Sequence, residues 1–269
     1  MKTINAQTVV FVTGAFVSHR GWDEWKKYFE SKGYKTLAPS HPNKDAPPAT
    51  LRHRHPDAAI ASNRLAGIVE HYTNIIKALP EKPIVIGHSL GGLITQILVN
   101  RDLAAAGIAI HSVPPRGVFP YEFSFLKAGW RALGIFTSVK KSYLMSFKTW
   151  QYAFTNGMTL EDQQKAYEVS TIPESKLAAR DGLTKAAAVD FKKSHVPLLL
   201  ISGSEDNIIP ASLNLRNFKA YKTPDSITEL KEVRGNNHYV VNLPNWKETA
   251  DSILTWIESV DNRQLTTSH

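Results

Sequence analysis

The chain has 269 residues, of which 42% are hydrophobic and 21% charged, as expected for a globular protein whose core is one domain or one domain with an insertion. It has no cysteine, no run of about 18 apolar residues and no secretory signal pattern, so we expect a cytoplasmic protein without disulfides, thiolate metal sites or stable membrane insertion. The net charge is +8, but the basic residues are scattered and match no nucleic-acid motif, so we expect no nucleic-acid partner.

Short β-branched runs alternate with helical segments along most of the chain. Strands are predicted at residues 8–13, 34–38, 84–86, 107–111, 196–202 and 227–233. Helices are predicted at residues 21–32, 57–79, 91–100, 212–221 and 246–260. Strands that alternate with helices and are apolar almost throughout indicate a mostly parallel sheet with helices on both faces, which is the doubly wound α/β class.

One segment breaks this alternation. Residues 114–194 show no convincing strand, and we interpret them as an insertion after the fourth strand, which leaves 1–113 and 195–262 as the core and 263–269 as a flexible tail. The insertion is rich in aromatic residues, most of which we expect to pack it onto the core, while others line an apolar pocket. Its first half is also basic, which we interpret as a solvated face rather than a surface for anions or membranes.

The stretch PIVIGHSLGGLITQ, residues 83–96, joins the third strand to the third helix through a very short turn. Ser89 occupies the centre of this turn, with Gly87 and Gly91 two residues away on either side. A turn this tight strains its central residue and leaves no room for neighbouring side chains, and glycines relieve that crowding. The hydroxyl then stands clear of the backbone near the positive end of the helix, which makes Ser89 a candidate nucleophile.

A serine nucleophile needs a base and an acid that orients the base, and two later loops offer them. After the strand at 196–202 come Glu205 and Asp206, and His238 follows the last strand. The carboxyl ends of parallel strands meet at one edge of a sheet, so one crevice can hold Ser89, an acid and His238. Glu205 competes with Asp206 for the acid role, and Asp190, before the same strand, is a weaker alternative.

The elbow at 87–91, the loops GSED (203–206) and GNNH (235–238) and their order along the chain together resemble the α/β-hydrolase fold superfamily of serine esterases and lipases. The resemblance covers nearly the whole chain, with residues 114–194 in the place of the family's lid or cap. It implies that Ser89 is the nucleophile, His238 the general base and Asp206 the orienting acid. The family spacing, with the acid three residues after the glycine, favours Asp206.

The resemblance also implies an oxyanion hole made of two backbone N–H groups. Leu90, directly after the nucleophile, would supply one of them, and Ala15, in the loop after the first strand, would supply the other. Many family members carry His-Gly in that loop, whereas this chain has Thr13-Gly14, so the shape of the loop is left open. Phe16 is a weaker donor candidate that could instead wall the acyl site.

Several side chains are candidates for contact with substrate because they flank the expected crevice or belong to the aromatic insertion. These are Phe16, His88, Phe119, Phe123, Trp130, Trp150 and Tyr239.

No metal site or cofactor is predicted. The stretch LRHRHPD (51–57) holds a His-x-His near His41, but it lacks the spacings of a known zinc pattern, and we interpret it as a mobile loop before the long helix. The glycines at 87, 91 and 92 fit neither a dinucleotide nor a phosphate-loop fingerprint.

These features predict a serine hydrolase that acts on a small-molecule carboxylic ester with an apolar acyl or aryl part. Serine as the nucleophile argues against haloalkane dehalogenases and epoxide hydrolases, which use aspartate. Hydroxynitrile lyases related to plant esterases carry lysine beside the catalytic histidine, and Tyr239 at that position argues against this activity too. Lactonase, thioesterase, amidase, C–C hydrolase and cofactor-free perhydrolase activities stay open on the same triad. A ligand-binding receptor without turnover also stays open as an alternative. The sequence does not decide between a monomer and a homodimer.

Overall fold

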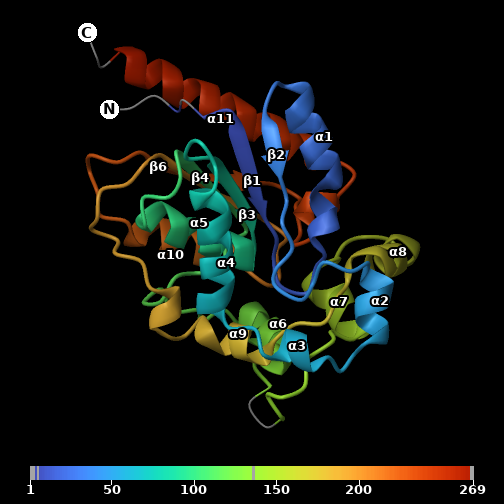
Figure 1. Cartoon of the computed structure of the whole chain (residues 1–269). Coiled ribbons are helices and arrows are strands. Elements are labelled where there is room, and N and C mark those ends of the chain that lie inside the picture. Colours follow the sequence, from blue (N-terminus) through green and yellow to red (C-terminus); the bar gives the residue numbers. More distant parts are fainter. Residues whose placement is uncertain (1–3, 5, 135–136, 267–269) are drawn as a thin grey trace.

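A computed structural model describes residue 4 and residues 6–134 and 137–266 of the chain, with the backbone alone at 130, 131, 261 and 263–266. Six parallel strands form one sheet in the order β2-β1-β3-β4-β5-β6 (Figure 1). Their bounds are β1 Thr8–Val12, β2 Lys35–Leu37, β3 Ile84–His88, β4 Ala106–Ile110, β5 Leu198–Gly203 and β6 Thr228–Val233. The predicted α/β class is confirmed, and each strand lies within two residues of its predicted bounds.

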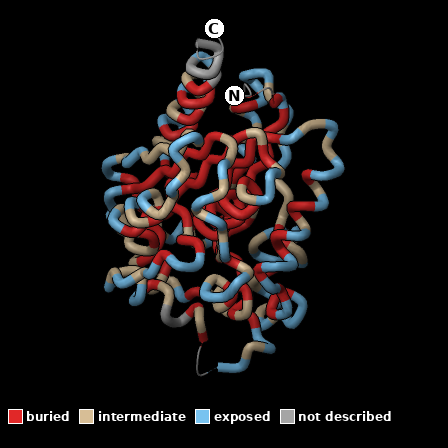
Figure 2. The backbone as a smooth tube through the Cα atoms, turned by 90° about the vertical axis from the view of Figure 1, so that its left-hand side faces the viewer, coloured by how far each residue is buried: buried red, intermediate tan, exposed pale blue. Residues whose placement is uncertain are grey.

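Helices cover both faces of the sheet because its strands bury alternate side chains on opposite sides. In β1, Val9 and Phe11 pack toward α1 (Asp23–Ser31) and α11 (Trp246–Thr266), while Val10 and Val12 pack toward α4 (Leu65–Lys77) and α5 (Leu90–Asn100). The second face is covered by α4 Leu65–Lys77, α5 Leu90–Asn100 and α10 Ala211–Ala220. Figure 2 shows the buried chain concentrated in this central layer.

The helix predicted at 57–79 is two helices, α3 (Ala58–Ala61) and α4. The Asp57 carboxylate caps the start of α3 by accepting from the N–H groups of Ala59 and Ile60. The N–H of Leu65, the first residue of α4, donates to the Asp181 carboxylate at 3.0 Å. A distant acid therefore sets the start of α4, which the local periodicity could not reveal.

Residues 114–194 are here called the insertion segment. Its described residues, 114–134 and 137–194, contain four α-helices that lie below the carboxyl edge of the sheet in Figure 1. They are α6 Phe123–Leu133, α7 Phe147–Ala153, α8 Leu160–Ser170 and α9 Lys176–Asp181. Helix α2 (Pro48–His53) contacts α8, so part of the stretch predicted as a mobile loop is helical and packed. The Leu51 side chain explains this correction because it is wholly buried against Ile60 and Ile172.

Short 3₁₀ turns complete the fold at His19–Trp22 (η1), Lys185–Ala187 (η2) and Val240–Asn242 (η3). Helix α11 continues to Thr266, past residue 263, where the flexible tail was predicted to begin, while residues 267–269 lie outside the described part. Of the helices in the described ranges, none is both long and apolar enough to span a bilayer.

Candidate active site

The candidate site lies where the order of the strands reverses. Strand β1 is followed in sequence by its neighbour on one side, β2, and then by its neighbour on the other side, β3. In a parallel sheet this arrangement opens a crevice at the carboxyl ends of the strands. Ser89 follows β3, Asp206 follows β5 and His238 follows β6, so the fold brings all three to this edge.

Ser89 is held in a strained backbone conformation, with φ 58° and ψ −117°. The turn closes because the Ser89 N–H donates to the Ile110 carbonyl at 2.9 Å. The two flanking glycines are required by space: a Cβ on Gly91 would lie 2.1 Å from the Val12 carbonyl oxygen, and one on Gly87 would lie 2.0 Å from the Gly91 carbonyl oxygen. The turn therefore tolerates no side chain at either position.

Ser89, His238 and Asp206 form a continuous line of hydrogen bonds. The Ser89 Oγ lies 3.0 Å from His238 Nε2, and His238 Nδ1 donates to Asp206 Oδ2 at 2.6 Å. The Ser89 side chain is almost buried, and the other two residues are fully shielded from solvent by neighbours such as Phe154, whose ring lies 4.9 Å from that of His238. In this tautomer Nε2 is free to accept the serine proton, which is the geometry of an activated nucleophile.

Asp206 is held as a carboxylate by four donors. Its Oδ1 accepts from the N–H groups of Ile208 (2.7 Å) and Ile209 (2.8 Å), and its Oδ2 accepts from two imidazoles, those of His238 and His111. Burial alone would raise the pKa of this carboxyl, but the two histidines and the hydrogen bonds outweigh it and hold the pKa well below its usual range. Glu205, the rival acid, is exposed, and its carboxylate accepts from the Ser204 hydroxyl at 3.3 Å rather than from an imidazole.

The two predicted oxyanion donors both border the cavity in front of Ser89. Leu90 is the first residue of α5, where a backbone N–H has no acceptor within its own helix. Ala15 lies in the loop after β1 (residues 13–18, the β1 loop), next to Phe16, whose φ of 66° is unusual for a residue with a side chain.

The insertion segment holds the β1 loop in place. The Phe16 carbonyl accepts from the Ile172 N–H at 2.9 Å, and the Phe16 N–H donates to Glu174 Oε2 at 3.4 Å. Glu174 is almost fully buried and forms an ion pair with Lys44, which is equally buried. Neither residue stood out in the sequence, because a lone acid and a lone lysine 130 positions apart carry no pattern.

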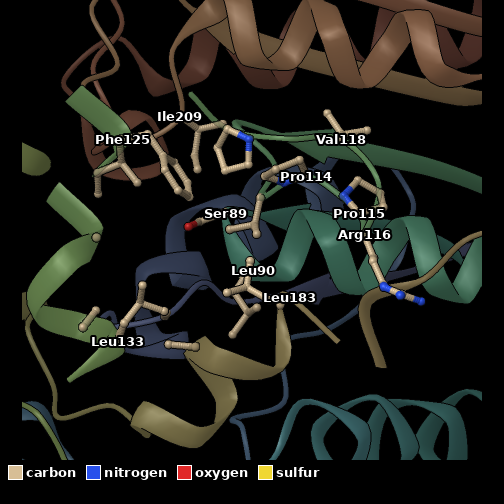
Figure 3. A pocket seen from close by; sticks show the side chains of 18 of the residues that line it. Ser89, Leu90, Pro114, Pro115, Arg116, Val118, Phe125, Leu133, Leu183 and Ile209 are labelled. Atoms are coloured by element: carbon tan, nitrogen blue, oxygen red, sulfur yellow. The ribbon is translucent and has the colours of Figure 1, made fainter. Parts of the chain in front are cut away.

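The Ser89 hydroxyl faces an apolar cavity of about 720 Å³ between the sheet edge and the insertion segment (Figure 3). Its walls come mainly from the loop after β4 and from α6 and α9. Figure 3 shows Phe125 and Leu133 of α6, together with Leu183, around the serine, while the Arg116 side chain points away from it. Among the described residues that line the cavity, Glu174 is the one that is both charged and buried.

The structure places the residues that were predicted to contact substrate in different positions relative to the cavity. Phe16 and Phe119 line the cavity, the latter at its exposed rim with 75% of its surface accessible. Phe123 does not line it because its side chain is turned to solvent. The Trp130 side chain lies outside the described residues.

The remaining three predicted contacts lie behind the wall rather than in it. Trp150, a candidate for contact with substrate, is fully buried and stacked on Phe154 at 4.3 Å, and its ring does not border the cavity. Tyr239 donates to or accepts from the Ser170 hydroxyl at 2.6 Å. His88 packs beneath the site, 4.7 Å from the His238 ring. These three residues pack around Phe154 and His238 and do not border the described cavity.

Within the described part of the chain, the grouping of side chains best suited to hold a metal ion is His111, Asp206 and His238. Their nitrogen-to-oxygen distances of 2.6 and 2.7 Å are those of hydrogen bonds. Ligands at about 2.0–2.1 Å from one ion would lie farther apart than that. The residues therefore fit proton-mediated contacts better than a shared ion.

Comparison with known families identifies the class of protein that this fold and site belong to. The model of the alpha/beta hydrolase family matches residues 9–252. The chain is thus a member of that family. Comparison with curated protein sequences gives no significant match.

Solved structures with the same fold include several ester hydrolases. A mutant of polyneuridine aldehyde esterase superposes with a TM-score of 0.66 at 16% identity, covering 93% of this chain and 99% of its own. A monoacylglycerol lipase of Paleococcus ferrophilus gives 0.64 at 21% identity, covering 94% of each chain. A methylesterase from Arabidopsis gives 0.66 at 17% identity, covering 93% of this chain and 98% of its own. At these identities the likeness supports the fold.

Proposed function

We propose that the chain is a serine hydrolase that cleaves carboxylic esters with an apolar acyl or aryl part. The observation that carries this proposal is the line of hydrogen bonds from Ser89 through His238 to Asp206, which opens on an apolar cavity. The names of the structural relatives, an esterase, a lipase and a methylesterase, support an ester as the scissile group.

In the proposed reaction, the Ser89 Oγ attacks the ester carbonyl while His238 Nε2 takes its proton. The resulting oxyanion is bound by the N–H groups of Leu90 and Ala15. His238 then protonates the departing alkoxide, which leaves as the alcohol, and an acyl group remains on Ser89. A water molecule, deprotonated by His238, attacks this acyl-enzyme, releases the carboxylic acid and restores the serine.

The shape of the cavity suggests which part of the substrate lies in it. Its walls offer apolar side chains and few polar groups, so binding depends on burying apolar surface, worth about 25 cal/mol per Å². Such a wall distinguishes substrates by length and bulk more than by polar groups. We therefore expect the catalytic efficiency, kcat/KM, to rise with acyl chain length until the cavity is filled and to fall beyond that point.

The test is the hydrolysis of p-nitrophenyl esters from acetyl to dodecanoyl by the wild type and by Ser89→Ala. Steady turnover with an optimum at intermediate length, lost in the variant by about 10⁴-fold or more, supports the proposal. Ser202→Ala is the matched control: it removes a buried hydroxyl of β5 that has no hydrogen-bond partner among the described residues, and activity should be unchanged. Turnover that survives in Ser89→Ala contradicts the proposal.

The absence of ester turnover would lead to a second set of assays on the same triad. Lactones, thioesters, amides and carbon–carbon substrates would then be compared with the same pair of proteins. A fluorophosphonate that labels Ser89 without any turnover would favour a receptor that retains a reactive serine.

A further inference from the structure

The Asp206 carboxylate serves two histidines, although the reaction needs only one. His111, directly after β4, donates from Nδ1 to Asp206 Oδ2 at 2.7 Å, and His238 donates to the same oxygen at 2.6 Å. The planes of the two rings are inclined at 49°, with centroids 6.1 Å apart, so both approach one oxygen from different directions. The proposed mechanism leaves the second imidazole without a role.

The fold makes specific room for His111. Its side chain is fully buried, its N–H donates to the Ile201 carbonyl at 2.7 Å, and its φ of 45° turns the ring toward Asp206. The neighbouring residue at the end of β5 is Gly203, where a Cβ would lie only 2.5 Å from the His111 ring. A side chain at Gly203 would therefore displace the ring.

His111 is present as the neutral imidazole with its proton on Nδ1. A carboxylate can only accept a hydrogen bond, so Nδ1 must be the donor. Burial lowers the pKa of His111, and the charge of Asp206 opposes this only in part. Nε2 has no hydrogen-bond partner among the described residues, as expected of a bare nitrogen facing the glycine.

We propose that His111 is a positioning residue that fixes the Asp206 carboxylate and shares its charge, so that His238 is available as a base at lower pH than a single pair would allow. A carboxylate with one imidazole partner holds that imidazole more strongly in its charged form. When a second N–H donates to the same oxygen, the carboxylate stabilises the charged form of the first imidazole less, but its hydrogen bond still orients that ring. This inference rests on the proposed function.

The titratable groups around His111 are few. Asp206 faces it from the loop after β5, His238 from the loop after β6, and His88, at the end of β3, lies 6.2 Å away by ring centroids. Burial lowers the pKa of His88 well below its usual value. A change at His111 therefore acts on the pair formed by Asp206 and His238.

The experiment compares the pH dependence of ester hydrolysis in His111→Leu, His111→Asn and the wild type. The leucine variant lacks the donor, so the pH at which kcat/KM reaches half its plateau on the acidic side should rise by about half a unit or more. The plateau and KM should change by less than about tenfold. The asparagine variant retains an N–H at the same distance from the backbone and should return the half-point toward the wild-type value.

The matched control is His195→Asn, because His195 is a half-buried histidine that bonds to Val196 and Thr228 at the opposite end of β5. Its pH profile should equal that of the wild type. An acidic half-point unmoved in His111→Leu, or moved equally in His111→Asn, would overturn the proposal.

Two further measurements are independent of turnover, and the second is also independent of the folding of the variants. The rate at which a fluorophosphonate labels Ser89 as a function of pH reports the same half-point without an ester substrate. Proton NMR of the wild type should show two slowly exchanging imidazole N–H signals at low field, from His111 and His238. One such signal alone would contradict the inference, whereas a failure of ester hydrolysis with two signals would contradict only the proposed function.

Discussion

The two sides of the candidate site are built in different ways. On the sheet side, Ser89, Asp206 and His238 follow three strands of one hydrogen-bonded sheet, and each polar atom of the line has a partner. On the side of the insertion segment, the wall is apolar, formed by helices and loops, and partly open to solvent. Under the proposed function, the core would hold the reacting groups while the insertion segment would select the substrate.

A group of contacts around Glu174 crosses this division. Glu174 belongs to the insertion segment, yet it accepts from Phe16 in the β1 loop and pairs with Lys44 of the core. Backbone hydrogen bonds from Ile172 to Phe16 and from Ser18 to Ser170 join the same two regions. The insertion segment therefore also supports the loop that carries the proposed Ala15 donor.

The largest expected effect comes from the sheet side. In Asp206→Asn the amide cannot hold His238 in the required tautomer, so kcat should fall by about 10⁴-fold. Glu205→Gln is the control, because this rival acid is exposed and does not reach His238; its rate should stay within about twofold of the wild type. Equal losses in the two variants would contradict the assignment of the acid.

The next largest effect is expected at the Lys44–Glu174 ion pair. Lys44→Met leaves the Glu174 carboxylate buried without its cation, so the free energy of unfolding should fall by about 3–5 kcal/mol and Tm by roughly 10 °C. Turnover should also fall, because without its cation the Glu174 carboxylate is no longer fixed beside the Phe16 N–H of the β1 loop. The double variant Lys44→Met/Glu174→Gln should recover most of the stability, and a double variant as unstable as the single one would contradict the pairing.

A smaller effect is expected in the cavity wall. Gly129 in α6 borders the cavity and has open space around it, so Gly129→Leu should fill part of the cavity. Hydrolysis of long-chain esters should fall by about tenfold while acetyl esters are unaffected. Gly67→Leu in α4 is the control, since it makes the same change at an open helical position away from the cavity. Identical chain-length profiles in both variants would contradict the proposed acyl site.

The smallest effect concerns acid stability. His41 is fully buried, and burial together with Lys44 lowers its pKa well below the usual value. The unfolded chain gains this proton below about pH 6.5 while the folded chain does not, so stability is complete above that pH and falls as the pH drops.

Unfolding experiments between pH 7 and 5 test this expectation. His41→Leu should reduce the slope of unfolding free energy against pH by about 1 kcal/mol per unit. His53→Leu, at an exposed histidine, should leave the slope unchanged, and an unchanged slope in His41→Leu would refute the explanation.

The comparison also explains how far the sequence could predict the molecule. The strands were predictable because buried parallel strands are apolar along their whole length. The turn at Ser89 was predictable because a serine between two glycines directly after a strand is a local pattern, although the crowding at Gly91 comes from the distant Val12. The break before α4 was not predictable, since it depends on Asp181, which lies more than a hundred residues away in the sequence. Local patterns do not carry such contacts.

The same limit applies to the site. His111 carried a usable signal, because it lies just past the carboxyl end of a strand, at the same edge of the sheet as the candidate residues that come after β3, β5 and β6. Glu174 and Lys44 carried none, because their pairing depends on how the insertion segment folds over the core. Aromatic content likewise could not separate Phe119, which borders the cavity, from Trp150, which is packed behind it.

The most direct test of the account is to find the residue that reacts with a fluorophosphonate. The account predicts a single phosphonyl adduct, located by peptide mass spectrometry on Ser89. It also predicts that labelling is slower by about 10³-fold or more in His238→Ala, which lacks the base. An adduct on a different serine, or labelling of Ser89 at the wild-type rate in His238→Ala, would contradict the claim that Ser89 and His238 form one catalytic unit.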